Sequence, residues 1–553
     1  MSPFQRKLAA YSRDRTFLIR AVLTILAACV LLGFVVAKFS KDEISKEERE
    51  ERVVRSIIAY ESDRDRDELT DLLLERGQVT PEALAHYITF VENFVMRNLG
   101  YHATRSVEEV MELASPLELA GLAVETHQGV LTTEQILLFE SYVRALYQSE
   151  NKETAREFLA GQAAADPPVR FANAFLGQAL SRIPDRREEA ISYFAREAEL
   201  FPRADFARFR QLDLNLQLNN DAEVKRLLDD RDYRRLLSSY SMTEIGARTQ
   251  DPLLILEGSY RYTLRRMASR IFPLALFAGM VWFIILSKLG GVERLRSSRL
   301  PLYALGVLAG FASILVTDLF IIWQEEVFGF EENGEFLNDL LYCISGIGLR
   351  EETAKILLFL PFVPFIAKRR TQIEILITAG CVGLGFAIIE NIDYFDGQGG
   401  TVENAFPRLV TASFAHVSLT GILGLALCRF WHWPKKCWEE FVGTFVAVVL
   451  VHGLYDALLI VKELKEQLGV LAFVVFVLLV RYYFKKIGET RGTSRQVISP
   501  LGVFVIGATL VVGASWIFAM RHFNLDLAID GVGKSALASA ILAFLYINEF
   551  RNE

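Results

Sequence analysis

Apolar positions along this chain form long runs in two separate parts of the sequence. One run, 21–37, lies near the start between Arg20 and Lys38. After residue 270 such runs follow one another closely, at approximately 271–287, 300–323, 339–366, 372–395, 408–430, 441–461, 467–484 and 501–520, with a weaker one at 531–549. About 20 apolar residues cross a hydrocarbon core of about 30 Å. The pattern therefore predicts an anchor helix at 21–38 and a bundle of eight or nine spanning helices at 271–550.

The intervening segment, 41–268, is charged and carries helical apolar spacing. Within it a pattern recurs 35 positions later, with Ala155, Leu159 and Pro167 followed by Ala190, Phe194 and Pro202. A small residue, a large one four positions on and a closing proline are typical of the second helix of a tetratricopeptide (TPR) unit, whose period is about 34 residues. We therefore predict an all-α chain whose 41–268 domain is TPR-like, with an ordinary helical-hairpin domain as the alternative.

The first apolar run has two interpretations. Val35-Val36-Ala37 resembles the cleavage site of a signal peptide. The run is longer than the roughly 7–15 residues of a signal-peptide core, which favours a retained anchor.

Basic residues orient the predicted helices, because cytoplasmic loops carry an excess of Lys and Arg. Residues 1–20 contain Arg6, Lys7, Arg13, Arg15 and Arg20, so this end is predicted to be cytoplasmic. Alternation then places 41–268 outside, in a multi-pass protein of the cell (inner or plasma) membrane. The segment 261–270 is basic on the predicted outer side and departs from the rule.

Composition narrows the functional classes. The chain has 553 residues, of which 52% are apolar and 23% charged, and its net charge is −7. A net negative charge argues against a nucleic-acid partner. The five cysteines contain no CxxC pair, so their spacing indicates neither a zinc knuckle nor a disulfide framework.

Ionisable side chains inside the predicted spanning segments are the candidates for function, because each costs about 2.5–3.5 kcal/mol to insert. They fall in four consecutive segments and form this set: Glu351, Glu352 and Lys355; Glu390 with Asn391; His416; and His452 with Asp456. Glu351 and Lys355, like His452 and Asp456, stand four apart and share a helix face.

Their depths agree. At about 1.5 Å per residue, Glu351 lies ~18 Å, His416 ~12 Å, His452 ~14 Å and Glu390 ~8 Å from the predicted outer end of its helix. All four fall in the extracytoplasmic half of the membrane. We therefore predict one site, within a core at 339–461.

Two chemistries suit these groups. Glu351, His416, His452 and Asp456 could bind a divalent metal such as zinc, which leaves a position for an activated water. Alternatively, a buried glutamate takes the proton from water with no metal, while His452 or Asp456 stabilises the oxyanion. Structural roles remain open too: an ion pair for Glu351 and Lys355, and a helix cap for Glu390-Asn391.

Four sequence blocks resemble the PrsW family of polytopic membrane proteases, which is related to the CAAX- and bacteriocin-processing proteases. They are REETAK at 350–355, GLGFAIIENIDYF at 383–395, PRLVTASFAHVSLTGILG at 407–424 and VHGLYDALL at 451–459, all within roughly 300–480. The resemblance implies cleavage of membrane-anchored regulators, such as anti-sigma factors, near the extracytoplasmic face.

The resemblance also implies roles for individual residues. Glu351 would be the general base and Glu352 its paired carboxylate. His416 would bind the water or a metal, and His452 with Asp456 would complete the site, supported by Lys355, Glu390 and Asn391. Related CAAX-type proteases have Asn where this chain has Asp456. This difference leaves open whether the chemistry is metal-dependent or glutamate-type, and slightly favours the latter.

The predicted function is therefore an intramembrane endopeptidase whose TPR-like domain recruits, gates or filters substrates. Two other classes remain as alternatives. One is a proton-coupled or ion-coupled transporter, which would use the same buried charges as a relay. The other is a catalytically inactive scaffold that binds peptides through the TPR-like domain. The substrate, the trigger and the oligomeric state do not follow from the sequence.

Overall fold

A computed structural model of the chain describes residues 9–40, 152–202, 204–292, 297–396, 402–490, 499–522 and 528–551, with single residues at 7, 137, 138, 141, 142, 145 and 525. Every regular element in these ranges is a helix. The predicted all-α fold class is therefore confirmed for the part of the chain that is described. Most of the first half of the predicted TPR-like domain lies outside these residues.

The chain divides into two compact units, which are described one at a time. One comprises Met1–Asp42 with Ser259–Glu553 and is called the membrane unit below; the other is Glu43–Gly258. The division falls inside helix α16 (Pro252–Ala268), whereas the sequence placed it after residue 268.

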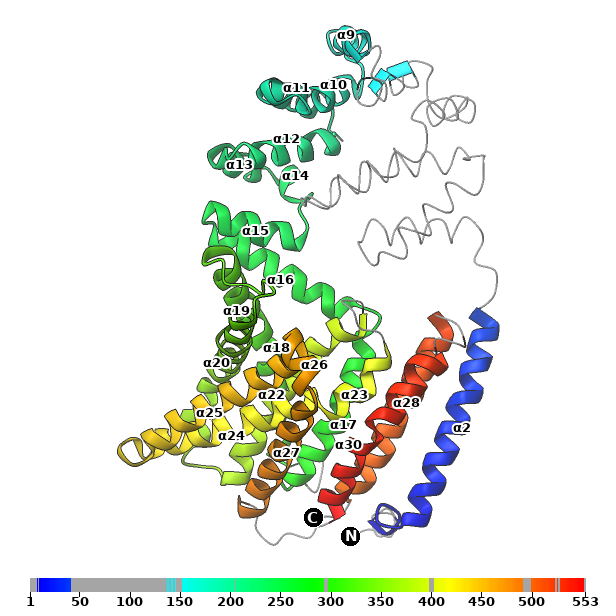
Figure 1. Ribbon diagram of the computed structural model, residues 1–553, viewed down its shortest axis with the longest axis vertical. Coiled ribbons are helices and arrows are strands. Elements are labelled where there is room, and N and C mark those ends of the chain that lie inside the picture. The colour runs from blue at the N-terminus through cyan, green and yellow to red at the C-terminus, as the bar shows by residue number, and fades with distance from the viewer. Residues whose placement is uncertain are drawn as a thin grey trace. The chain divides into compact units, whose positions relative to one another are not determined.

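From Lys152 onward, the described part of the Glu43–Gly258 unit consists of short helices joined by tight turns (Figure 1). They are α9 (Lys152–Ala163), α10 (Ala172–Ser181), η1 (Pro184–Arg186), α11 (Arg187–Leu200), α12 (Asp205–Gln217), α13 (Asp221–Leu228), α14 (Arg231–Arg234) and α15 (Ser239–Thr249). The repeated positions Ala155, Leu159, Ala190 and Phe194 are all buried. A Cβ on Gly177 would lie 3.0 Å from the Phe194 ring, so this glycine lets α10 and α11 pack closely. Helical hairpins are thus present, and their TPR character stays a prediction.

The membrane unit contains the long apolar helices. They are α2 (Arg15–Ser40), α17 (Phe272–Leu289), α18 (Leu300–Ile322), α22 (Gln372–Asp396), α24 (Ala412–His432), α25 (Pro434–Ile460), α27 (Val470–Thr490), α28 (Pro500–His522) and α30 (Lys534–Arg551). Short helices between them are η2 (Trp323–Val327), η5 (Val402–Asn404), α23 (Ala405–Val410), α26 (Lys462–Leu468) and η6 (Ala528–Gly533). Eight helices of the described residues are long and apolar enough to cross a membrane, or nine with the α26–α27 pair, which is bent by 80°.

The segment 339–366 departs from the single spanning helix that its apolar pattern predicted. It consists of α19 (Phe336–Leu341), a π-helical segment η3 (Tyr342–Gly348), α20 (Leu349–Phe359), a short 3₁₀ turn η4 (Leu360–Phe362) and α21 (Val363–Ile366). Pro361 and Pro364 explain the breaks at its end, because proline lacks the N–H that an α-helix needs. The acidic and basic groups of the first predicted block lie on α20.

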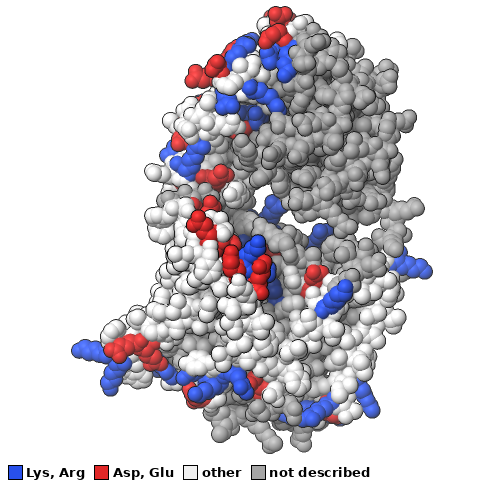
Figure 2. All heavy atoms as spheres, viewed as in Figure 1, with Lys and Arg blue, Asp and Glu red and all other residues white. Residues whose placement is uncertain are grey.

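The outer face of α25 shows how this unit meets lipid. Its exposed apolar side chains recur every four residues, at Trp438, Val442, Val446, Leu450 and Leu454. That spacing is one face of a helix. Figure 2 shows a broad uncharged surface on this unit, with charged side chains gathered along its lower edge. A multi-pass membrane protein accounts for such a surface.

Helix α2 lies alongside α28 (Figure 1). The Ser499 amide donates to Ser12 Oγ at 3.1 Å, and a Cβ on Gly33 would lie 2.6 Å from the Trp516 ring nitrogen. The predicted anchor is therefore packed against α28 within the membrane unit.

Glycines let the central helices approach closely enough to form the site. A Cβ on Gly385 of α22 would lie 2.0 Å from the Val307 carbonyl oxygen of α18. A Cβ on Gly383 would lie 2.2 Å from the His416 carbonyl oxygen of α24. On α25, a Cβ on Gly453 would lie 2.4 Å from the Ile344 Cα of η3. The chain thus places small residues beside the candidate site, where α22, α24, α25 and η3 meet.

Candidate active site

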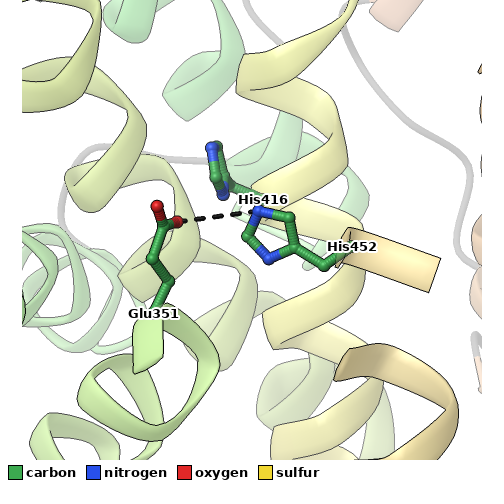
Figure 3. Close-up of side chains that lie close together, drawn as sticks. All are labelled: Glu351, His416 and His452. Atoms are coloured by element: carbon green, nitrogen blue, oxygen red, sulfur yellow. Dashed lines mark ion pairs between the residues drawn. The ribbon is translucent and has the colours of Figure 1, made fainter. Parts of the chain in front are cut away.

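Three side chains from three helices meet inside the membrane unit. Glu351 extends from α20, His416 from α24 and His452 from α25, and they point toward one another (Figure 3). One ligand atom from each lies within 4.8 Å of the others, and all three residues are buried. The two imidazole rings stand edge to face, with centroids 5.2 Å apart. The sequence had placed these residues in one layer from depth alone.

Glu352 lies behind this group and is fully buried. One carboxylate oxygen accepts from Lys355 Nζ at 2.8 Å and lies 2.9 Å from His452 Nδ1. The other accepts from Thr420 Oγ1 at 3.4 Å. An ionised carboxylate can accept hydrogen bonds but cannot donate them. His452 Nδ1 therefore carries a proton and donates a hydrogen bond to Glu352.

Lys355 is also fully buried and joins both glutamates to His416. Its Nζ donates to Glu351 Oε2 at 3.2 Å, lies 2.9 Å from His416 Nδ1 and sits 3.9 Å from the centre of the Phe386 ring. Buried charges persist only when they are paired and hydrogen-bonded. Lys355 therefore pairs with both carboxylates that precede it on α20 and balances one of their two negative charges.

His452 Nε2 forms long ion-pair contacts with two more carboxylates, and Figure 3 shows the one with Glu351. It lies 3.6 Å from Glu351 Oε2 and 3.4 Å from Asp456 Oδ2, longer than an ordinary N–H···O bond. Three polar groups thus converge at distances longer than an ordinary hydrogen bond. Such a convergence can take up a water, a carbonyl oxygen or a metal.

A second polar chain reaches His416 from the other side. Its Nε2 lies 2.9 Å from Glu390 Oε2, and the same oxygen lies 2.8 Å from Arg408 Nη2. Arg408 Nε donates to Asn391 Oδ1, and Asn391 Nδ2 donates to Ser413 Oγ at 3.1 Å. Glu390 and Asn391 therefore contact the site through His416 and Arg408.

All eight residues that the sequence selected lie in this one network, and none is left outside it: Glu351, Glu352, Lys355, Glu390, Asn391, His416, His452 and Asp456. Sequence reasoning missed Arg408, Thr420 and Phe386. Arg408 is the first residue of the apolar run 408–430, so the sequence predicts it at the end of a helix and not in the site. Two other acidic residues near spanning segments lie elsewhere, since Glu374 pairs with Arg299 and Asp318 with Arg266.

The donor set fits a divalent metal. Two imidazoles and a carboxylate are the ligands of many catalytic zinc sites, which keep a further position open. Glu351, His416 and His452 would hold the ion. Lys355 contacts His416 Nδ1 in this structure, so it would compete with a metal for that nitrogen.

Buried, convergent glutamates and histidines in a bundle of apolar helices define a membrane-embedded hydrolytic centre as the class of site. Residues 299–482 match the family described as PrsW family intramembrane metalloprotease. The match includes the four helices that supply the site, so this part of the chain is similar to that family. No curated protein matches the chain. No solved structure matches it either.

The family match confirms the predicted resemblance and the class of enzyme, an intramembrane protease. It favours hydrolysis over the alternatives of a transporter and an inactive scaffold. The roles of the individual residues, the substrate and the side of the membrane remain predictions.

Proposed function

We propose that this protein is an intramembrane endopeptidase in which Glu351 takes the proton from the attacking water. The observation that carries this assignment is the contrast between the two neighbouring glutamates. The Glu351 side chain keeps 11% of its surface exposed and faces Nε2 of His452, whereas the Glu352 side chain has no exposed surface. Only Glu351 can reach a water or a peptide bond.

Glu352 orients rather than reacts. Because it accepts from His452 Nδ1 and from Lys355, it fixes the imidazole with Nε2 toward Glu351 and Asp456. This is the usual arrangement by which a carboxylate behind a histidine sets the tautomer and direction of its ring. His452 Nε2 and Asp456 then face the position of the scissile carbonyl.

A divalent metal, when bound, would supply Lewis-acid polarisation of that carbonyl. Glu351, His416 and His452 are the residues that would hold it. The orienting contact from Glu352 to His452 is needed with or without the ion.

The substrates we propose are membrane-anchored proteins, among them regulators of the anti-sigma-factor kind, cut near the extracytoplasmic face. The depth of the site and the basic N-terminus support that side. The helical domain before α16 then recruits or filters substrates, or binds a peptide ligand, outside the membrane.

N-terminomics of membrane proteins tests the proposal in cells that express wild type, Glu351→Gln, His416→Ala or the control Glu489→Gln. Glu489 forms an ion pair with Lys486 on α27 and belongs to no part of the site. We expect a set of new N-termini that appears with wild type and the control and is lost with the first two variants. If no cleavage product depends on Glu351 or His416, the protein is not a protease.

A further inference from the structure

Arg408 is a strong cation beside the site that sequence reasoning did not select. It lies on α23, just before the break that precedes α24, and its side chain is largely buried. Three of its partners belong to α22. It pairs with Glu390, donates to Asn391 and stacks on Tyr394, with Cζ 3.5 Å from the ring centre. Three contacts on one helix hold the guanidinium in a single position.

Arg408 and His416 share one atom. Glu390 Oε2 lies 2.8 Å from Arg408 Nη2 and 2.9 Å from His416 Nε2. A carboxylate held by a guanidinium has little freedom to rotate away. The position of Glu390 relative to the imidazole is therefore set by Arg408.

The two neighbours of His416 together fix its tautomer. The Lys355 ammonium has only donors, so the nitrogen 2.9 Å from it, Nδ1, must offer its lone pair. The Glu390 carboxylate has only acceptors, so Nε2 must carry the proton. The ring is thereby aligned between a cation and an anion.

We propose that Arg408 is a positioning residue, which holds Glu390 against His416 and so fixes the orientation and the Nε2–H tautomer of that histidine. The inference rests on the proposed function for its relevance to catalysis. Without Arg408, Glu390 loses its cation and turns away from the ring. With no partner left at Nε2, the ring is free to turn away from Lys355. His416 then populates both tautomers, and Nδ1 no longer offers a constant lone pair to the side where Lys355 and Glu351 lie.

The test is nitrogen-15 NMR of the full chain in detergent micelles, labelled at the histidine ring nitrogens, with His416 assigned from the His416→Gln spectrum. We compare wild type with Arg408→Gln, Arg408→Lys and the control Arg429→Gln. Arg429 is also an ion-paired arginine, on α24 itself, but its partner is Glu440. We expect a single Nε2–H tautomer in wild type and control, a mixture in Arg408→Gln, and partial recovery in Arg408→Lys.

A second measurement connects the tautomer to catalysis. The rate at which Glu351-dependent products form should fall about 10–100-fold in Arg408→Gln, the usual effect of removing a group that orients a site histidine. Arg408→Lys should recover part of that rate. If Arg408 made only a structural contact, Arg408→Gln would instead lower the amount of folded protein and leave the His416 tautomer unchanged.

The outcomes separate the two proposals. An unchanged Nε2–H tautomer in folded Arg408→Gln overturns the role of Arg408 even if the protein is a protease. A mixed tautomer with no Glu351-dependent cleavage supports Arg408 and overturns the proposed function. Should Arg408→Gln fail to fold, the double variant Arg408→Gln/Glu390→Gln leaves no unpaired charge. The Gln side chain at position 390 can donate or accept a hydrogen bond, so it does not select one tautomer of His416. A single Nε2–H tautomer in the double variant would therefore also overturn the inference.

Discussion

Glu351 and Glu352 are chemically identical neighbours that the fold places in different surroundings. Successive residues of a helix point about 100° apart. One carboxylate therefore faces the two histidines, and the other enters a pocket formed by Lys355, Thr420 and His452. Their loss should have different consequences for stability.

Replacing Glu352 by Gln should destabilise the membrane unit by about 3–5 kcal/mol, the usual cost of breaking a buried ion pair from one side. Glu351→Gln should cost much less, because Lys355 keeps its 2.8 Å contact with Glu352. Thermal unfolding of both variants in detergent measures the difference. Equal melting temperatures would show that Glu352 is not the structural partner of Lys355.

The membership of the site could be predicted from sequence because ionisable side chains inside apolar runs are rare. Two features of the site could not be predicted from the sequence. The separate roles of Glu351 and Glu352 depend on which helix lies on which side of α20. The role of Arg408 depends on its contact with Glu390, which lies on another helix. In the sequence, an arginine at the edge of an apolar run looks like an ordinary interfacial anchor.

Helix packing around the site depends on Gly453, which lies beside His452 on α25. A Cβ there would lie 2.4 Å from the Ile344 Cα, a backbone atom that cannot turn aside. On the same helix, a Cβ on Gly443 would meet no other atom within 4 Å. The two glycines form a matched pair for a test of close packing.

Gly453→Ala should destabilise the membrane unit by about 1–3 kcal/mol, as overpacking does in other cores. Gly443→Ala should be neutral or stabilising by up to about 1 kcal/mol, since alanine is the better helix former. Melting temperatures in detergent compare them. If the two variants melt alike, the contact between α25 and η3 is looser than described.

The same contact explains why the segment 339–366 was predicted imperfectly. An apolar pattern reports that a stretch is buried or lipid-facing, and it does not report the hydrogen-bond register of its backbone. The π-helical turn of η3 is set by packing against α25, through Gly348 and Gly453. The long uniform runs of α22 and α24 contain no such conflict, and they were predicted well.

Helices α10 and α11 carry a pH-dependent contact outside the membrane unit. Glu197 of α11 is buried and accepts from the Phe171 amide at 2.6 Å, at the start of α10. Burial raises the pKa of Glu197 above its ordinary 4.5, although hydrogen bonds from the backbone amides of Phe171, Ala174 and Asn173 act in the opposite direction.

Because the folded state holds the proton more tightly, this contribution to stability is complete below pH 4.5 and is lost as the pH rises through the raised pKa. The free energy needed to open α10 and α11 should therefore decrease as the pH rises from 4.5 through the raised pKa of Glu197. Hydrogen exchange of the 171–174 amides, measured between about pH 4 and pH 7, reports it. Glu197→Gln is the control and should remove the pH dependence; if it does not, another group is responsible.

Contacts between distant parts of the chain account for one arginine of the basic segment 261–270, which departs from the orientation rule. Arg266 of α16 is held inside the membrane unit by Asp393 at 2.8 Å and Asp318 at 3.4 Å, and it stacks on Tyr262. Its charge is neutralised by helices α22 and α18. A paired arginine gives no information about which side of the membrane it faces.

Arg266 also decides where the helical domain can be removed. Deleting 43–258 should leave a folded membrane unit with the melting temperature of the full chain, because Arg266 stays. Deleting 43–268 should lower that temperature, since Asp318 and Asp393 lose their cation, and Arg266→Gln in the full chain should reproduce the loss. Identical stability of both deletions would contradict the importance of this triad.

The shorter deletion also tests recruitment. N-terminomics with residues 43–258 absent should show a changed set of products that still depends on Glu351. Unchanged cleavage of the native substrate would show that the domain neither recruits nor filters.

The π-helical turn ahead of Glu351 has a consequence for how this protein tolerates changes of length. A π turn holds one residue more than an α turn. Removing Ser345, which is exposed, would let η3 continue as α-helix while Gly346, Gly348 and Glu351 keep their places against α25. Removing one residue from the buried middle of α22 would instead rotate Glu390 by about 100°. Related sequences should therefore vary by one residue before the glutamate pair and remain constant in length between Gly383 and Glu390.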